Sequence, residues 1–245
     1  MRGRPYEPVR RAARDERTTL NRKAIIIVAI TAALAAAAPA TGGAAGAPCA
    51  ADYSYAGLVA PSNAAGVAAT ITPLATPGVL RGHVAGWVGV GGEGYGPQGT
   101  TEWLQVGISA FPGAGARIYY EVRQPYWAPV YREVGIDVAP GEPHRLAVLR
   151  VAGKRSTWRV WVDGHAVSPA YYLPDSGGWK PEATAESWND GSGVCNDYSF
   201  RFTGLAYAAR PGGSWRGLPG GEEFQDPGYL MIRHSPMSFD ARSLR

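Results

Sequence analysis

The stretch GWVGVGGEGYGPQGTTEWLQVGIS, residues 86–109, holds two short strand-like runs joined by a polar, glycine-rich loop. The runs cover residues 87–90 and 103–108. Side chains along a strand point alternately to its two faces. In the second run, one face carries only apolar side chains: Leu104, Val106 and Ile108. The other face presents Trp103 and Gln105, so we expect something to bind there.

The loop within this stretch matches the G-x-G-x-x-G pattern of dinucleotide-binding loops at residues 89–94. Such a loop needs a helix directly after it, whose N-terminus faces the pyrophosphate. Here Tyr95, Gly96 and Pro97 follow, and then another strand. We therefore interpret the loop as a hairpin connection and predict no cofactor.

Short strand patterns recur along the rest of the chain, which is rich in Gly, Pro, Trp and Tyr. They cover residues 53–59, 66–71, 117–124, 131–138, 144–151, 157–162, 182–188 and 198–208. No amphipathic helix or internal repeat interrupts them. We predict one all-β domain over residues 50–215, a two-sheet antiparallel sandwich. Residues 216–245 are predicted to be a C-terminal tail, with an added edge strand at 229–232.

The first 45 residues form a basic leader. Eight of the 24 basic residues and three of the 20 acidic ones lie in it, which leaves 16 basic and 17 acidic residues in the remainder. Residues 24–38 are apolar and too few to span a bilayer easily. This predicts a signal peptide cleaved after Ala40 or Ala45, with an uncleaved signal anchor as the alternative. We expect a secreted protein that contacts membrane only through that segment and binds no nucleic acid.

The two cysteines, Cys49 and Cys195, are expected to form one disulfide in an exported protein, and two free thiols are the alternative. Two cysteines alone cannot build a zinc site, and the histidines lack H-E-x-x-H spacing, so we predict no metal. The sequence also lacks a G-x-S-x-G nucleophile elbow.

Gln105 and Glu186 are the polar residues most suited to chemistry. Each lies in a predicted strand, two residues from a tryptophan on the same face, Trp103 and Trp188 respectively. A carboxyl group beside aromatic rings loses hydration, which suits general acid/base catalysis. A carboxamide can donate a hydrogen bond to a developing oxyanion. The alternative interpretation is a surface glutamate and a cross-strand glutamine on an inert sheet.

Six short motifs follow one another between residues 53 and 202. They are Y-A-G at 55–57, W-V-G-V-G-G at 87–92, W-L-Q-V-G at 103–107, I-Y-Y-E at 118–121, V-A-P-G at 138–141 and T-A-E-S-W at 184–188. In this order they resemble the motifs of the glutamic peptidases, or eqolisins. Agreement of the whole ordered set carries more weight than any single motif.

The resemblance implies a concanavalin A-like jelly roll with a substrate groove across its concave sheet. It implies that Glu186 activates water as general base and then protonates the leaving amine, while Gln105 stabilises the oxyanion. These two side chains are then expected on adjacent strands, close enough to share one water. The side chains expected to contact the substrate are Trp103, Tyr119, Glu121, Trp161 and Trp188.

Three features depart from the family pattern. Glu186 is followed by S-W-N-D instead of W-I-V-E, Gly91 replaces an aspartate, and Tyr119 stands where tryptophan is more frequent. Two functions are therefore weighed for a secreted, monomeric protein. The first is an acid endopeptidase acting on polypeptides. The alternative is a non-catalytic module that binds extracellular carbohydrate or peptide in the same groove, and a structural domain without a groove is a third reading.

Overall fold

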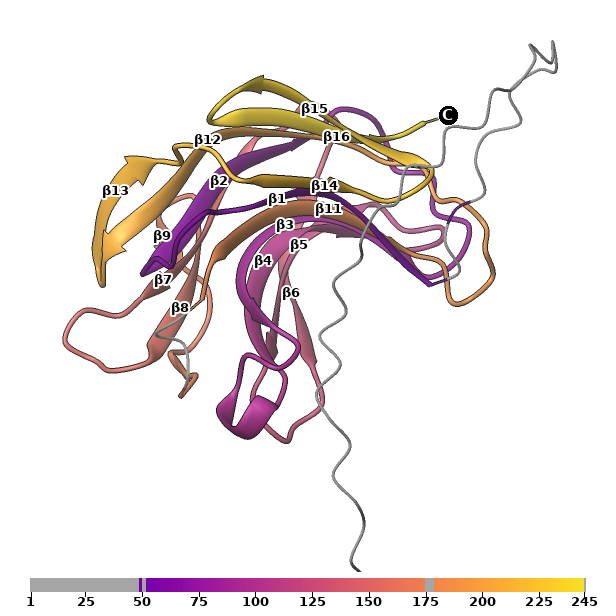
Figure 1. Ribbon diagram of the computed structural model, residues 1–245. Helices are drawn as coiled ribbons and strands as arrows, with labels where there is room; N and C mark the ends of the chain where they lie inside the picture. Colours follow the sequence, from indigo (N-terminus) through magenta and orange to yellow (C-terminus); the bar gives the residue numbers. More distant parts are fainter. Residues whose placement is uncertain (1–48, 50–51, 175–178, 245) are drawn as a thin grey trace, which may run out of the picture. The chain divides into compact units, whose positions relative to one another are not determined.

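The computed structural model describes residues 49, 52–174 and 179–244, in which sixteen strands form two antiparallel sheets (Figure 1). Sheet A contains, in spatial order, β14 (Glu222–Gln225), β1 (Tyr53–Val59), β11 (Pro181–Trp188), β3 (His83–Gly92), β4 (Glu102–Ala110), β5 (Ala116–Arg123) and β6 (Val130–Val138). Sheet B contains β10 (Tyr171–Tyr172), β8 (Thr157–Val162), β7 (His144–Arg150), β2 (Gly66–Pro73), β12 (Ser199–Arg210), β16 (Ser238–Ser243) and β15 (Tyr229–Ser235). Two further strands pair at the sides of sheet B, β9 (His165–Ala166) with β8 and β13 (Gly213–Gly217) with β12.

The core lies between the two sheets, and period-two alternation determines which side chains enter it. On β4, Leu104, Val106 and Ile108 are fully buried, as the sequence predicts. Phe200 and Phe202 on β12 of sheet B are buried in the same core. The predicted all-β, two-sheet antiparallel sandwich is therefore confirmed.

The glycine-rich loop connects two antiparallel strands, β3 and β4, and contains a single 3-10 turn at Pro97–Gly99. Gly91 and Gly94 adopt positive φ angles of 94° and 75°, a region that glycine enters without the steric cost of a Cβ. The loop leads into a strand, so its glycines serve a hairpin turn as predicted.

After residue 215 the expected edge strand at 229–232 is present within β15, and β14 and β16 are strands that the predicted tail did not include. β14 pairs with β1 at the edge of sheet A, and β15 and β16 extend sheet B, so the sandwich continues to Ser243. β14 has no apolar alternation because it is an edge strand without a buried position. The segment from Glu222 to Ser243 is therefore part of the sandwich domain.

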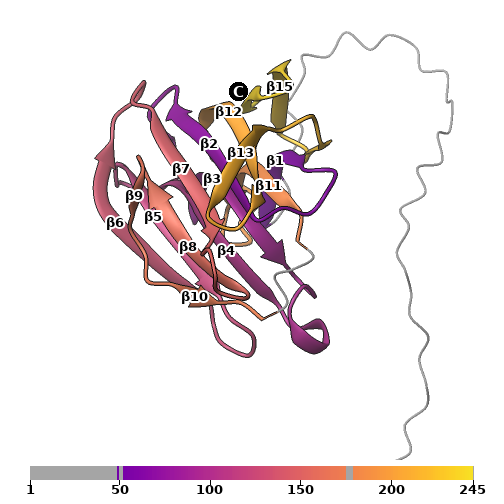
Figure 2. The same cartoon turned by 90° about the vertical axis from the view of Figure 1, so that its left-hand side faces the viewer.

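Sheet A is bent, and its outer face, turned away from sheet B, is concave (Figure 1). Figure 2 shows the molecule from the left-hand side of Figure 1, with β2, β7, β8 and β13 facing the viewer. In the described part of the chain, no helix is long and apolar enough to span a membrane. The predicted signal segment, residues 1–45, lies outside the described residues.

The predicted disulfide between Cys49 and Cys195 is present and joins residues 146 positions apart in sequence. A cross-link over so long a loop restricts the unfolded chain strongly. We expect the Cys49→Ser/Cys195→Ser variant to lose about 2–5 kcal/mol of unfolding free energy, measured by urea denaturation. Reducing agent should shift the midpoint of the wild type but leave that of the variant unchanged. Equal midpoints for oxidised wild type and variant would contradict the prediction.

Candidate functional site

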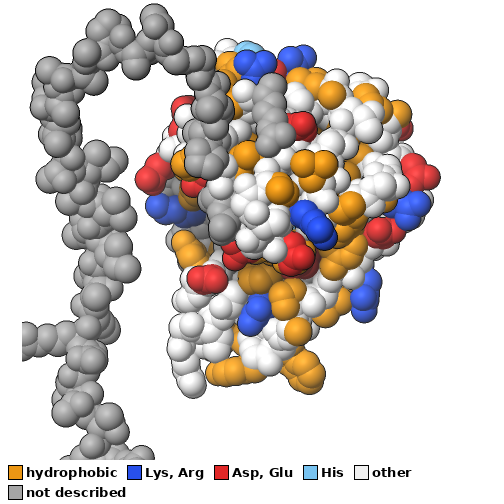
Figure 3. All heavy atoms as spheres, turned by 90° about the vertical axis from the view of Figure 1, so that its right-hand side faces the viewer, with side chains coloured by type: hydrophobic (Ala, Val, Ile, Leu, Met, Phe, Trp, Pro, Cys, Tyr) orange, Lys and Arg blue, Asp and Glu red, His pale blue; other side chains and the backbone are white. Residues whose placement is uncertain are grey.

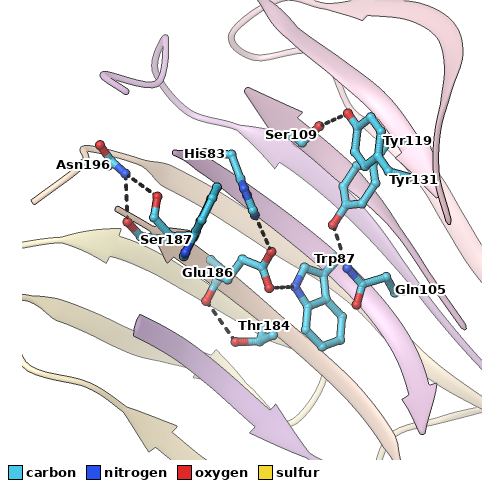
Figure 4. A network of polar contacts seen from close by, with 12 residues as sticks. His83, Trp87, Gln105, Ser109, Tyr119, Tyr131, Thr184, Glu186, Ser187 and Asn196 are labelled. Carbon is cyan, nitrogen blue, oxygen red and sulfur yellow. Dashed lines mark hydrogen bonds and ion pairs between the residues drawn. The ribbon is translucent and has the colours of Figure 1, made fainter. Parts of the chain in front are cut away.

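Glu186 projects from β11 onto the concave face of sheet A, and both of its carboxylate oxygens have partners (Figure 4). The indole Nε1 of Trp87 donates a hydrogen bond of 2.8 Å to Oε2, and His83 Nε2 lies 3.0 Å from Oε1. Both partners come from β3, where His83, Ala85 and Trp87 share one face and Ala85 is in register with Glu186. Only 6% of Glu186 is exposed, so this carboxylate is held in one orientation.

Gln105 projects from β4 onto the same face, as the alternation in the sequence predicts. Its amide Nε2 donates a hydrogen bond of 3.1 Å to the hydroxyl of Tyr119 on β5. Tyr119 in turn stacks on Tyr131 of β6, with ring centroids 5.0 Å apart. A carboxamide nitrogen carries two hydrogens, so one N–H of Gln105 remains available for a further acceptor.

Glu186 and Gln105 lie in the same sheet but not on adjacent strands, which corrects the prediction. β3 runs between β11 and β4, and the indole of Trp87 lies between the two side chains (Figure 4). Gly107 makes room for that ring, because a Cβ at this position would lie 2.7 Å from the Trp87 Cβ and 2.9 Å from the Tyr119 ring. The indole is thus both a hydrogen-bond donor to Glu186 and a spacer.

A pocket of about 520 Å³ opens over these residues. Its lining includes Gln105 and four glutamates: Glu93, Glu121, Glu182 and Glu186. The rings of Tyr53, Tyr55, Trp87 and Trp103 complete much of its wall. On the side of the molecule opposite to Figure 2, acidic and hydrophobic side chains lie next to one another near the middle of the face (Figure 3). The pocket therefore combines proton-transfer groups with aromatic contact surface.

The environment of Glu186 shifts the pKa values of its neighbours. Burial, followed by the negative charge of Glu186, raises the pKa of Glu121 and brings that of Tyr53 to about 12. The same two causes raise the pKa of Tyr119 well above 10. Both tyrosine hydroxyls therefore stay protonated from acidic to moderately alkaline pH, and that of Tyr119 continues to accept from Gln105.

Glu182 lies four residues before Glu186 on the same face of β11, in register with Gln105 across Gly89. Burial, followed by the charge of Glu186, raises the pKa of Glu182 from 4.5 to about 7. The folded state binds the Glu182 proton more tightly than the unfolded state does. This proton therefore contributes its full stabilisation to the fold below about pH 4, and that contribution is lost as pH rises to about 7.

We therefore expect Glu182→Gln to leave the unfolding free energy nearly unchanged at pH 4 and to raise it by about 2–3 kcal/mol at pH 8. Urea denaturation at both pH values measures this difference. Glu223→Gln, which neutralises an exposed carboxylate on β14, is the matched control. A gain for Glu182→Gln that is equal at pH 4 and pH 8 would contradict the assignment.

The structure brings most of the predicted substrate-contact residues to this pocket, but not all. Trp103 and Glu121 line it. Tyr119 is only 2% exposed and contacts Gln105 instead, while Trp188 packs against Tyr53 and His83 at one end. The placement of Trp161 was wrong, because β8 belongs to sheet B and Trp161 lines a different pocket.

Three residues of this region were not singled out from the sequence. His83 and Glu182 share faces with Trp87 and Glu186 at even spacing, so alternation could have identified them. Asn196 has no such signal. Its buried side chain donates to the backbone of Arg81 and Trp188 at 2.8 and 3.1 Å, and thereby fixes the segment before β3 against the end of β11.

No protein-family model and no curated protein matches the sequence. Solved structures do match. Scytalido-glutamic peptidase with a peptide-based transition state analog has a TM-score of 0.55 and 17% identity, covering 79% of this chain and 98% of that one. SCP-B, a member of the eqolisin family in complex with the tripeptide Ala-Ile-His, has a TM-score of 0.51 and 16% identity, with the same coverage. The resemblance therefore holds at the level of architecture: the chain has the fold of the glutamic peptidases.

Proposed function

We propose that this protein is a secreted endopeptidase that hydrolyses peptide bonds with Glu186 and Gln105. The observation that carries the proposal is the buried Glu186 carboxylate, fixed by Trp87 and His83 at the wall of a pocket that Gln105 also lines. The disulfide supports export, because such bonds persist in oxidising compartments.

In the proposed reaction, the Glu186 carboxylate takes a proton from a water molecule as that water attacks the carbonyl carbon of the peptide. The free N–H of Gln105 donates to the oxyanion that develops on the carbonyl oxygen. Protonated Glu186 then gives its proton to the amide nitrogen, the C–N bond breaks, and an amine leaves. Tyr119 holds the Gln105 carboxamide in place through its hydroxyl.

The charge of the pocket favours work at acidic pH. Below about pH 7 the carboxyl of Glu182 is neutral, since its pKa is raised to about 7. At higher pH its ionisation adds a negative charge near Glu186 and Gln105, which repels an acidic substrate segment and opposes the developing oxyanion. Activity is therefore expected to fall as pH rises through about 7.

The test is incubation of the purified protein with denatured casein from pH 2 to pH 8, with mass spectrometry of the peptides released. Glu186→Gln serves as the negative control for contaminating peptidases. The expected result is internal cleavage by the wild type that is absent from the control. Absence of cleavage at every pH, or equal cleavage by the variant, would refute the proposal.

The second candidate is a binding module that uses the same pocket without catalysis. The stacked rings of Tyr53 and Tyr55, 5.9 Å apart, and the ring of Trp103 favour it, because such rings bind sugars or extended peptides. This candidate predicts saturable binding of a glycan or peptide that Trp103→Ala abolishes, with no product formed by the wild type.

A further inference from the structure

A second pocket, of about 500 Å³, lies on the outer face of sheet B, the face nearest the viewer in Figure 2. We call it the arginine pocket. The lining residues that matter are Arg145, Arg150, Arg159, Trp161 and Trp215. They come from β7, β8 and β13, so the pocket is remote in the fold from the Glu186 site on sheet A.

Strand alternation and two small side chains create this pocket. On β8, Trp158 and Val160 enter the core, so Arg159 and Trp161 point to the outer face. Trp161 is in register with Ala147 of β7, which is in register with Ala68 of β2. Both alanines line the pocket, and their short side chains leave a hollow beside the indole.

The positive charge of the arginine pocket is not balanced by acidic side chains among the described residues of its lining. No Asp or Glu is among the described residues that line it, and none of its three arginines forms an ion pair in the described part of the chain. The nearby carboxylate of Asp163 instead accepts from His144 Nδ1 and from the Arg145 backbone, each at 2.7 Å.

Two of the guanidinium groups also have an N–H without an acceptor, and that of Arg150 lies over the Trp158 ring, 6.0 Å from its centroid. The Nε atoms of Arg150 and Arg159 are buried and have no hydrogen-bond acceptor within the described chain. The Nη1 of Arg145 donates to the Gly204 carbonyl at 2.7 Å, and burial lowers the pKa of this arginine. Buried donors without acceptors are costly, and a bound oxyanion toward which these guanidinium groups turned would satisfy them.

The two indoles of the pocket indicate that its ligand contains a ring. Trp161 is partly buried and Trp215 is 40% exposed at the edge of the pocket. Indole faces pack against the apolar faces of sugar rings, and guanidinium groups bind carboxylate or sulfate in a bidentate manner. From this combination we propose that the arginine pocket binds an acidic saccharide, a pyranose unit carrying carboxylate or sulfate groups.

The test is calorimetric titration of the full-length protein with trigalacturonic acid and with a heparin-derived tetrasaccharide, which separate carboxylate from sulfate. Maltotriose, hexaglutamate and inorganic sulfate are the comparison ligands. At least one acidic saccharide is expected to bind at low salt, with weaker binding at high salt. Maltotriose should not bind, and hexaglutamate and sulfate should bind at least about tenfold more weakly.

Variants locate the site. Arg159→Gln and Trp161→Ala are each expected to weaken binding at least about tenfold, and Arg159→Lys and Trp161→Phe are milder versions in case a variant fails to fold. Arg242→Gln, an exposed arginine on β16 outside the pocket, is the charge-matched control and should bind like the wild type. Glu186→Gln should also bind normally, which separates this proposal from the peptidase proposal.

Three outcomes would overturn the proposal. The first is no binding of either acidic saccharide at millimolar concentration. The second is binding that Arg159→Gln and Trp161→Ala leave unchanged. The third is equally tight binding of hexaglutamate or inorganic sulfate, which would indicate a general anion site without recognition of a ring.

Discussion

Replacing Glu186 by glutamine is expected to lower kcat for peptide hydrolysis by at least about 10³-fold while leaving the protein folded. A glutamine side chain keeps an oxygen that can accept a hydrogen bond from the Trp87 indole. In the wild type, Trp87 Nε1 donates this bond to Glu186 Oε2 over 2.8 Å. It cannot take a proton from water at any working pH. Single-turnover cleavage of a fluorogenic peptide measures the loss, and the melting temperature reports the fold.

The matched control for this prediction is Glu223→Gln, which removes a carboxylate of the same kind from the exposed edge strand β14. It should keep the kcat of the wild type. Peptide affinity of Glu186→Gln should be close to that of the wild type, because the pocket walls are unchanged. If the variant unfolds, or if KM rises while kcat is retained, Glu186 has a structural role and not a catalytic one.

Replacing Gln105 by alanine is expected to lower kcat by about 10²–10³-fold, the range found when one oxyanion donor is removed. The carboxamide is the pocket-lining amide donor on the concave face, and one of its N–H groups is already used by Tyr119. The loss should appear in kcat more than in KM, since the oxyanion forms only in the transition state. Steady-state kinetics at the pH of maximal activity measure both.

The variant Tyr119→Phe is expected to lower kcat by a smaller factor. It removes the hydroxyl that accepts from Gln105 but keeps the ring stacked on Tyr131. Because Gln105 then loses its orientation without losing its donor, kcat should fall less than in Gln105→Ala. Gln124→Ala, a carboxamide that contacts the Tyr172 carbonyl elsewhere, is the control. Equal activity of wild type and Gln105→Ala would contradict the oxyanion role.

Local pattern predicted much of the architecture. The alternation Leu104, Val106, Ile108 identified the core face of β4 and, by the same rule, placed Gln105 on the opposite face. The rule works because successive side chains of a strand point to opposite sides, whatever the strand pairs with. It also placed Glu186 on the side of β11 that is turned away from the core, whereas its neighbour Ala185 faces the core and is fully buried.

Alternation does not specify which strands become neighbours. Trp161 shows the limit: it faces outward on β8, as its pattern requires, but β8 belongs to the other sheet. The edge strand β14 was missed for a related reason, since a strand exposed at a sheet edge buries too few side chains to produce an apolar period.

The sequence by itself determined an all-β sandwich and the faces on which Gln105, Trp103 and Glu186 lie. Only the tertiary structure decided that β11 pairs with β3, which brings Glu186 to Trp87 and His83 from about a hundred residues away in the chain. It also decided that Trp87 separates Glu186 from Gln105. The physical reason is that side-chain direction is a local property of the backbone, whereas strand neighbours follow from packing of the whole sheet.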